Sequence, residues 1–425
     1  MSLFQTGQVQ RLRLHVLPTK RFKTFAISLF AGVPLREDTV TETALLPFVL
    51  RRGNAKLPET TAFRGKLDEM YGAGFGFDVY KRGDAQIVQF RMDVINDQFV
   101  SSEQSLLAEA LQFLGETVSD PLLEGDGFQA AYVKAEKETL HKRLDAIVND
   151  KIRYAAERCL EEMCEGEAYR LHPLGQRSDL PHISPESLYK RYLHWQREAA
   201  FDLYVVGDTT LDEVAALIEQ HFHIHDGAPS LYSATILKSG HGEIKRVVEE
   251  LDVGQGKLNL GLRTHTGYND PNYAALLMYN GILGGYPHSK LFLNVRERES
   301  LAYYASSRLD GHKGICTIQS GIEMQNYDRA VAIIEEQLEA MKRGELTELE
   351  LSQTKAMLTN QLREMQDSAF EMTAYHFNSV FSGIERPVEQ LLAEVNAVTS
   401  EQIVSVAQHV ELDTIYFLRN RKEAR

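Results

Sequence analysis

The chain has 425 residues, of which 43% are hydrophobic and 25% charged, a composition typical of two or more globular domains. Its formal net charge of −14 at pH 7 argues against nucleic-acid binding, which requires clustered Lys and Arg. Three cysteines are too few for a disulfide framework and indicate a reducing compartment, so we expect a cytoplasmic protein.

The first predicted element is a buried strand within the apolar run from Thr24 to Leu35, ending near Gly32. The run is too short to span a bilayer, which takes about 20 residues. The rest of the sequence has no membrane segment either, so we expect no membrane partner.

The elements that follow this strand occur twice in the same order. In the first half, a helix at 43–52 is followed by a helix with a strand from 63 and by an amphipathic helix from 105. A long helix at 128–164, a capped helix from 183 and a closing strand from 202 complete this half. In the second half, a strand from 257 is followed by a helix at 273–283, a helix with a strand from 293 and an amphipathic helix from 329. A long helix at 347–381, a capped helix from 398 and a closing strand from 414 complete this half. This order predicts an internal duplication.

The duplication predicts two homologous α+β domains, each an antiparallel-rich sheet covered by helices. We place them at residues 1–225 and 243–425, joined by a linker over residues 226–242 that is rich in Gly, Ser and Ala. Two like domains joined in this way can close over a shared chamber.

Three histidines lie in five residues at the edge of the linker, in the segment HFHIH. His221, His223 and His225 share one face if the segment is extended, so they are weak candidates for metal ligands. Solvated histidines beside a linker are the simpler interpretation.

A longer motif lies in the second half, where residues 282–307 read ILGGYPHSKLFLNVRERESLAYYASS. This segment resembles the C-terminal half of the pitrilysin/insulinase zinc peptidases, in the branch of the mitochondrial processing peptidases. The stretch from His172, HPLGQRSDLPHISPESLYKRYLHW, and the strand YVVGD from Tyr204 are similar to the end of the family's first repeat. The resemblance covers nearly the whole chain and implies one half of a metallopeptidase clam shell.

The zinc motif of this family is absent. Active members bind zinc through His-x-x-Glu-His on the first helix of the N-terminal repeat, where the Glu acts as general base. Counting back from Gly53, which matches the Gly after that motif, the ligand and base positions hold Ala44, Pro47 and Phe48. None of these side chains can bind a metal or accept a proton.

The resemblance also implies roles for other residues. Glu136 is the first choice for the position of the third zinc ligand and Glu138 the second, although a Glu without a partner on a helix surface is the simpler interpretation. Arg296 and Tyr303 match an Arg and a Tyr that hold substrate near the zinc in active members. The strand at 74–80 matches an edge strand that holds extended substrate by β-augmentation.

We therefore expect a non-catalytic, zinc-less homologue that acts as a partner subunit. It would pair with an active zinc peptidase homologue, or with itself as a dimer, and help to bind or position a peptide or protein substrate. We expect no cofactor in this chain, and zinc only in a partner subunit. The alternatives are a structural or peptide-binding subunit with no role in proteolysis, and a metallopeptidase whose metal site is rebuilt from the histidines and Glu136.

Overall fold

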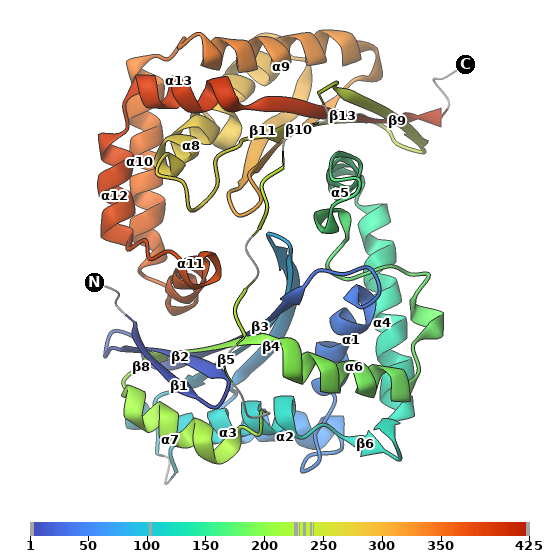
Figure 1. Ribbon diagram of the computed structural model, residues 1–425, viewed down its shortest axis with the longest axis vertical. Helices are drawn as coiled ribbons and strands as arrows, with labels where there is room; N and C mark the ends of the chain where they lie inside the picture. The colour runs from blue at the N-terminus through green and yellow to red at the C-terminus, as the bar shows by residue number, and fades with distance from the viewer. Residues whose placement is uncertain are drawn as a thin grey trace. The chain divides into compact units, whose positions relative to one another are not determined.

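The computed structural model describes residues 4–101, 104–224, 228, 230–232, 235–238, 240 and 242–421 (Figure 1). The chain divides into two compact units, and each unit includes a segment from the opposite half of the sequence. Unit 1 comprises residues 1–145, 171–233 and 367–381, and unit 2 comprises residues 146–170, 234–366 and 382–425.

The described part of unit 1 contains a six-stranded sheet with the order β1-β2-β8-β3-β5-β4. β2 and β8 are parallel, and the other neighbouring strands are antiparallel. β3 is buried along almost its whole length, which confirms the predicted first strand. The strands are β1 (Gln5–Val9), β2 (Leu12–Pro18), β3 (Thr24–Pro34), β4 (Gly74–Arg82), β5 (Ala85–Ile95) and β8 (Ala200–Gly207).

Helices flank this sheet, with α1 and α3 contacting β5 and α7 contacting β1 and β2. The helices are α1 (Val40–Leu50), α2 (Thr60–Glu69), α3 (Leu106–Ser119), α4 (Ala130–Asn149), α6 (Pro185–Glu198), α7 (Leu211–His221) and α11 (Ala369–Ser382). The short elements are η1 (Asp97–Phe99), β6 (Leu123–Glu124), β7 (Gly127–Phe128) and η3 (Leu180–His182).

The described part of unit 2 contains a five-stranded sheet with the order β11-β12-β10-β13-β9. Again one pair of neighbours, β9 and β13, is parallel and the rest are antiparallel. Read from β9, this order repeats β2-β8-β3-β5-β4 of unit 1, which confirms the predicted α+β duplication. The strands are β9 (Lys245–Leu251), β10 (Gly256–Arg263), β11 (Ala302–Asp310), β12 (Ile315–Ile322) and β13 (Glu411–Asn420).

Unit 2 also has α-helices, π-helical segments and short turns of helix. The α-helices are α5 (Lys151–Met163), α8 (Tyr273–Asn280), α9 (Tyr327–Lys342), α10 (Glu348–Met365), α12 (Val388–Ala397) and α13 (Ser400–His409). The others are η2 (Ala168–Arg170), η4 (Gly281–Gly285), η5 (Leu291–Arg298) and η6 (Met324–Asn326).

The prediction of one long helix in each half is wrong in one respect, because the structure has two consecutive helices at each of these places. Asp150 separates α4 from α5, and its carboxylate accepts a hydrogen bond from the backbone N–H of Arg153. Ser368 precedes α11, and its hydroxyl accepts from the backbone N–H of Glu371. Such caps satisfy the free N–H groups that begin a new helix. The breaks allow the equivalent second helices, α5 and α11, to belong to the unit of the opposite half.

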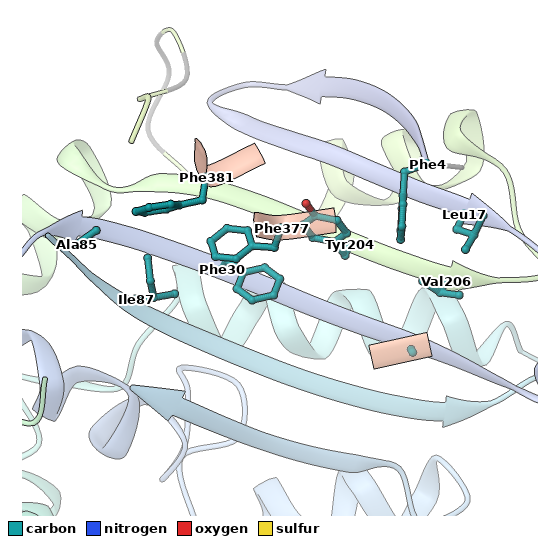
Figure 2. Packing of buried hydrophobic residues seen from close by; sticks show 10 residues of the cluster. Phe4, Leu17, Phe30, Ala85, Ile87, Tyr204, Val206, Phe377 and Phe381 are labelled. Atoms are coloured by element: carbon teal, nitrogen blue, oxygen red, sulfur yellow. The ribbon is translucent and has the colours of Figure 1, made fainter. Parts of the chain in front are cut away.

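The exchanged helix α11 packs aromatic side chains onto one face of the unit 1 sheet (Figure 2). The ring of Phe377 stacks on that of Phe30 from β3, with centroids 4.0 Å apart. Phe381 extends the same cluster, in which Tyr204 and Val206 come from alternate positions of β8. Because alternate strand residues face one side of a sheet, a single face presents this apolar surface to the helix.

A buried carboxylate, Asp202 on β8, lies beside this cluster. Arg13 donates from Nε to Oδ1 at 2.7 Å and from Nη2 to Oδ2 at 2.6 Å. Nε2 of His15 lies 2.8 Å from Oδ1, and the hydroxyl of Tyr232 donates to Oδ2 at 2.7 Å. Burial raises the pKa of Asp202, but the hydrogen bonds from Arg13 and His15 outweigh it and lower the pKa to about 2.

Helix α11 adds His376 to this polar region. Its Nδ1 lies 3.0 Å from the hydroxyl of Tyr204, and its ring centroid lies 5.4 Å from that of His15. Burial lowers the pKa of His376 to about 4, and the neighbouring His15 contributes to the same shift. His376 is therefore neutral at pH 7, when Nδ1 can accept the hydrogen bond.

In unit 2, a comparable buried network connects the segment that contains α5 to the sheet. Arg263 of β10 donates to Oε1 of Glu167 at 2.8 Å and to Oδ2 of Asp413 at 3.2 Å. Lys313 lies with Nζ 2.9 Å from Oε2 of the same Glu167. Two cations thus meet two carboxylates, and all of these side chains are buried.

The position of His376 predicts that acid weakens the fold well above the pH at which carboxylates titrate. The unfolded chain protonates this side chain near its ordinary pKa of 6.5, whereas the folded chain does so only near 4. The unfolded state therefore binds more protons in between, and stability falls as the pH falls, by about 2 kcal/mol from pH 7 to pH 5.

Urea unfolding at these two pH values measures this effect. His376→Gln should lose this part of the pH dependence, whereas the matched control His194→Gln, at an exposed histidine of the same unit, should keep it. Equal pH dependence in the two variants would contradict the assignment.

Candidate functional site

Helix α1 places the residues at the zinc-motif positions in the core of unit 1. Ala44 and Phe48 are four residues apart, so they share one helix face, and both are fully buried. Pro47 is also buried, inside the helix, where its ring lacks the N–H of other residues. A methyl group, a pyrrolidine ring and a phenyl ring offer neither a metal ligand nor a proton acceptor, so the residues at this place do not fit zinc.

Glu136 on α4 does not lie free on a helix surface, so that interpretation is wrong. It is only 2% exposed and is paired with arginines at the end of α1. Its Oε2 lies 3.8 Å from Nη2 of Arg51, and its Oε1 lies 3.6 Å from Nη1 of Arg52. The carboxylate that the family resemblance assigns to zinc thus has guanidinium groups as its cations.

Aromatic rings and further guanidinium groups complete this region. The Phe48 ring meets the Phe77 ring of β4 edge to face, with centroids 4.8 Å apart. Cζ of Arg143, on α4, lies 4.7 Å from the centroid of Phe48, and Cζ of Arg51 lies 5.2 Å from that of Phe77. Guanidinium groups over aromatic faces are favourable cation–π contacts. We call Phe48, Phe77, Arg51, Arg52 and Arg143, together with Glu136, the arginine cluster.

Sequence reasoning missed the arginines of this cluster. Arg51 and Arg52 directly follow the degenerate motif, and this adjacency is the signal that could have found them. Arg143 comes from another helix, and nothing in its local sequence indicates its contact with Phe48.

The histidine segment begins at the end of α7. His221 is the last residue of α7, and the chain becomes extended at Phe222, where the buried Phe222 and Ile224 lie on either side of the exposed His223. Burial lowers the pKa of His221. Nδ1 of His223 lies 3.4 Å from the carboxylate of Asp120. His225 lies outside the described residues. Across the described ranges, no three or more His, Cys, Asp or Glu side chains gather in a group that could hold a metal ion.

Arg296 and Tyr303 are both exposed on unit 2, and each has its own partners. Arg296 lies in η5 with its Cζ 4.5 Å from the ring centroid of Phe292. Tyr303 lies in β11, and its hydroxyl donates to Oε1 of Glu323 at 2.7 Å. This hydrogen bond raises the pKa of Tyr303, so its hydroxyl keeps its proton at neutral pH.

A β-bulge accounts for the exposure of Tyr303. Ala302 pairs with Ile322 of β12 and Tyr304 pairs with Gly321, so Tyr303 is an extra residue in β11. A bulge changes the direction of a side chain relative to the regular strand. The ring is 63% exposed, although a large aromatic side chain gains free energy from burial.

Strand β4 forms an edge of the unit 1 sheet and, in the part of the chain that the structure describes, pairs only with β5. Its outer backbone groups are those that an added strand would use. The strand at 74–80, which the sequence analysis assigned to substrate, therefore lies at a sheet edge and carries Phe77 of the arginine cluster.

These features define a peptidase-like, duplicated α+β fold in which the zinc positions are occupied by non-ligating residues. The sequence model of the "Peptidase M16 inactive domain" matches residues 182–358. The chain is 40% identical over 417 residues to the "Probable inactive metalloprotease YmfF" of Bacillus subtilis (strain 168), which covers 97% of both chains. The chain therefore belongs to the M16, or pitrilysin/insulinase, peptidase family, and the resemblance found in its sequence is confirmed.

Solved structures show the same architecture. A conserved protein from Enterococcus faecalis V583 superposes with a TM-score of 0.91 at 33% identity, over 99% of each chain. The peptidase M16 inactive domain from Pseudomonas fluorescens superposes with a TM-score of 0.83 at 18% identity over 98% of each chain, which shows the shared fold. Within the described residues, no helix has the length and apolar character needed to cross a membrane.

The side chains at the zinc positions predict that the protein, purified without chelator or affinity tag, carries far less than one zinc per chain. Elemental analysis measures this ratio, with an HxxEH-bearing peptidase purified in parallel as the positive control. A ratio near one would contradict the account. If it fell in a His221→Ala/His223→Ala variant, the histidine segment would be the metal site.

Proposed function

We propose that the chain is a non-catalytic subunit that helps to bind and position an extended peptide for an active, zinc-bearing homologue. The observation that carries the proposal is the contrast between the two units. The positions that the resemblance assigns to zinc hold Ala44, Pro47 and Phe48 in unit 1, whereas Arg296 and Tyr303 of unit 2 stay exposed, with acidic partners, Glu297 and Glu323, that a ligand could replace.

The chemistry of this pair suits a substrate in the partner's active site. A guanidinium and a phenol can both donate hydrogen bonds to the oxyanion of a tetrahedral intermediate. The hydroxyl of Tyr303 is protonated and can donate to a ligand once it releases Glu323, its present acceptor. The β-bulge gives its side chain a direction outside the regular alternation of the strand. Neither residue supplies a nucleophile or a zinc ligand, so a partner must provide the bond-breaking chemistry.

The edge strand β4 supports the peptide-binding part of the proposal. An extended peptide can add to an open strand edge through main-chain hydrogen bonds, which favour extended segments of many sequences. The outer edge of β4 offers such a surface on unit 1. The partner in this proposal is a homologue with the zinc motif, or a second copy of this chain in a dimer.

A reducing compartment fits this assignment. Cys159, Cys164 and Cys316 are buried and form no disulfide. Burial raises the pKa of the thiol of Cys316 to about 12, and that of Cys159 is raised as well, so both thiols are unreactive at neutral pH. We accordingly place the protein in the cytoplasm.

The proposal predicts that an Arg296→Gln/Tyr303→Phe variant lowers the peptidase activity of the partner that co-purifies with the chain. Loss of one oxyanion donor costs about 100-fold in rate in a well-studied peptidase, so a decrease of tenfold or more is expected here. Activity is measured on a fluorogenic peptide, and assembly is measured by size-exclusion chromatography.

Arg298→Gln is the matched control, because this exposed residue lies two positions away and its side chain donates to Asn294 on its own helix. It should leave activity within about twofold, since isolated surface charges contribute little. Normal activity of the double variant in an intact complex would instead support a structural subunit with no role in proteolysis.

A further inference from the structure

The arginine cluster carries more positive charge than its surroundings neutralise. Arg51, Arg52 and Arg143 meet a single carboxylate, that of Glu136, in a chain whose net charge is −14. In the described ranges of the chain, Arg143 has no acidic partner, and its guanidinium lies over the rings of Phe48 and Phe77.

The guanidinium groups are close enough to repel one another. Burial lowers the pKa of Arg51, the attraction of Glu136 opposes this, and the like charges of Arg143, Arg52 and Arg64 lower it further. A bound anion would relieve this repulsion, because each guanidinium would gain an opposite charge.

The cluster also has hydrogen-bond donors to offer. The Arg52 side chain is 31% exposed, so its outer N–H groups can reach a ligand, although its Nε is buried without an acceptor. Arg143 is exposed, its Cζ lies over the ring of Phe48, and its N–H groups donate to no acceptor among the described residues. Planar guanidinium groups with fixed donors match the two oxygens of a carboxylate.

The location of the cluster beside β4 indicates which kind of ligand would carry the carboxylate. Phe77, which contacts both Arg51 and Arg143, belongs to the edge strand β4. Asp78, the next residue of β4, pairs with Arg91 of the neighbouring strand, so that aspartate is engaged elsewhere. A peptide added to β4 would pass beside the cluster, and alternate side chains of an extended peptide face the same side.

We propose that Arg143, Arg51 and Arg52 form a subsite that binds the carboxylate of a Glu or Asp side chain in an extended peptide lying along β4. The inference rests on the proposed peptide-binding function and specifies its ligand as an acidic peptide. Guanidinium groups thus occupy the place where an active relative holds a metal cation, and they act there as anion receptors.

Fluorescence polarisation of a dye-labelled decapeptide tests the subsite on the full-length chain. The peptide is amidated at its C-terminus and carries Glu at alternate positions, and a matched peptide carries Gln at the same positions. The acidic peptide should bind the wild-type chain about tenfold more tightly, in line with one or two charge-assisted hydrogen bonds. Arg143→Gln should remove this preference and leave the affinity for the Gln peptide unchanged.

Arg197→Gln is the matched control, since Arg197 is an exposed arginine of the same unit with no acidic partner among the described residues. It removes the same charge and should change the affinity for the acidic peptide less than twofold. An equal loss of affinity for the acidic peptide in the two arginine variants would show that the effect is general electrostatic attraction. This result would overturn the subsite. Thermal melting confirms that both variants remain folded.

The remaining outcomes separate this inference from the proposed function. Equal binding of the two peptides to the wild-type chain would overturn the acidic subsite and leave peptide binding intact. Binding of neither peptide would overturn the subsite together with the peptide-binding role. Competition by inorganic phosphate at the peptide's own concentration would identify a general anion site and overturn the peptide assignment. The dependence of the partner's activity on Arg296 and Tyr303 is a separate readout of the proposed function.

Discussion

A buried carboxylate requires a cation beside it, and this constraint determines which side chains surround the buried acids of both units. A lone charge inside a protein costs several kcal/mol, which is comparable with the whole stability of a domain. Asp202 meets Arg13 in unit 1, and Glu167 meets Arg263 in unit 2. Glu136 obeys the same rule, with arginines as its cations. Glu136, which the family resemblance assigns to zinc, thus lies beside arginines in this chain.

Much of the fold could be predicted from the sequence, because strands, helices and caps depend on neighbouring residues. The repeated order of elements revealed two related domains, and the sheets have matching topology. The exchange of α5 and α11 could not be predicted. An amphipathic pattern shows that one helix face is buried, but it does not show which sheet covers that face. The break at Asp150 is a single capping residue within a long helical pattern.

The candidate site also has a part that local sequence predicts and a part that it does not. The sequence alone shows that the positions assigned to zinc hold non-ligating residues, because Ala44, Pro47 and Phe48 lie within one short segment. The arginine contacts at this place could not be predicted, since Arg143 contacts Phe48 from a helix far along the chain. The exposure of Tyr303 was likewise hidden, because one extra residue in β11 shifts the register without a distinctive sequence. Contacts of this kind depend on how elements pack, and local sequence does not encode them.

Together these features describe an inactive homologue of the M16 peptidases, and we propose that it offers surfaces for an extended peptide. The most direct test incubates the chain with excess zinc and an acidic peptide, measures binding by calorimetry, and then analyses the peptide by mass spectrometry. The account predicts saturable binding and recovery of the intact peptide after prolonged incubation. Cleavage products that a chelator abolishes would contradict it, because they would require a metal site in this chain.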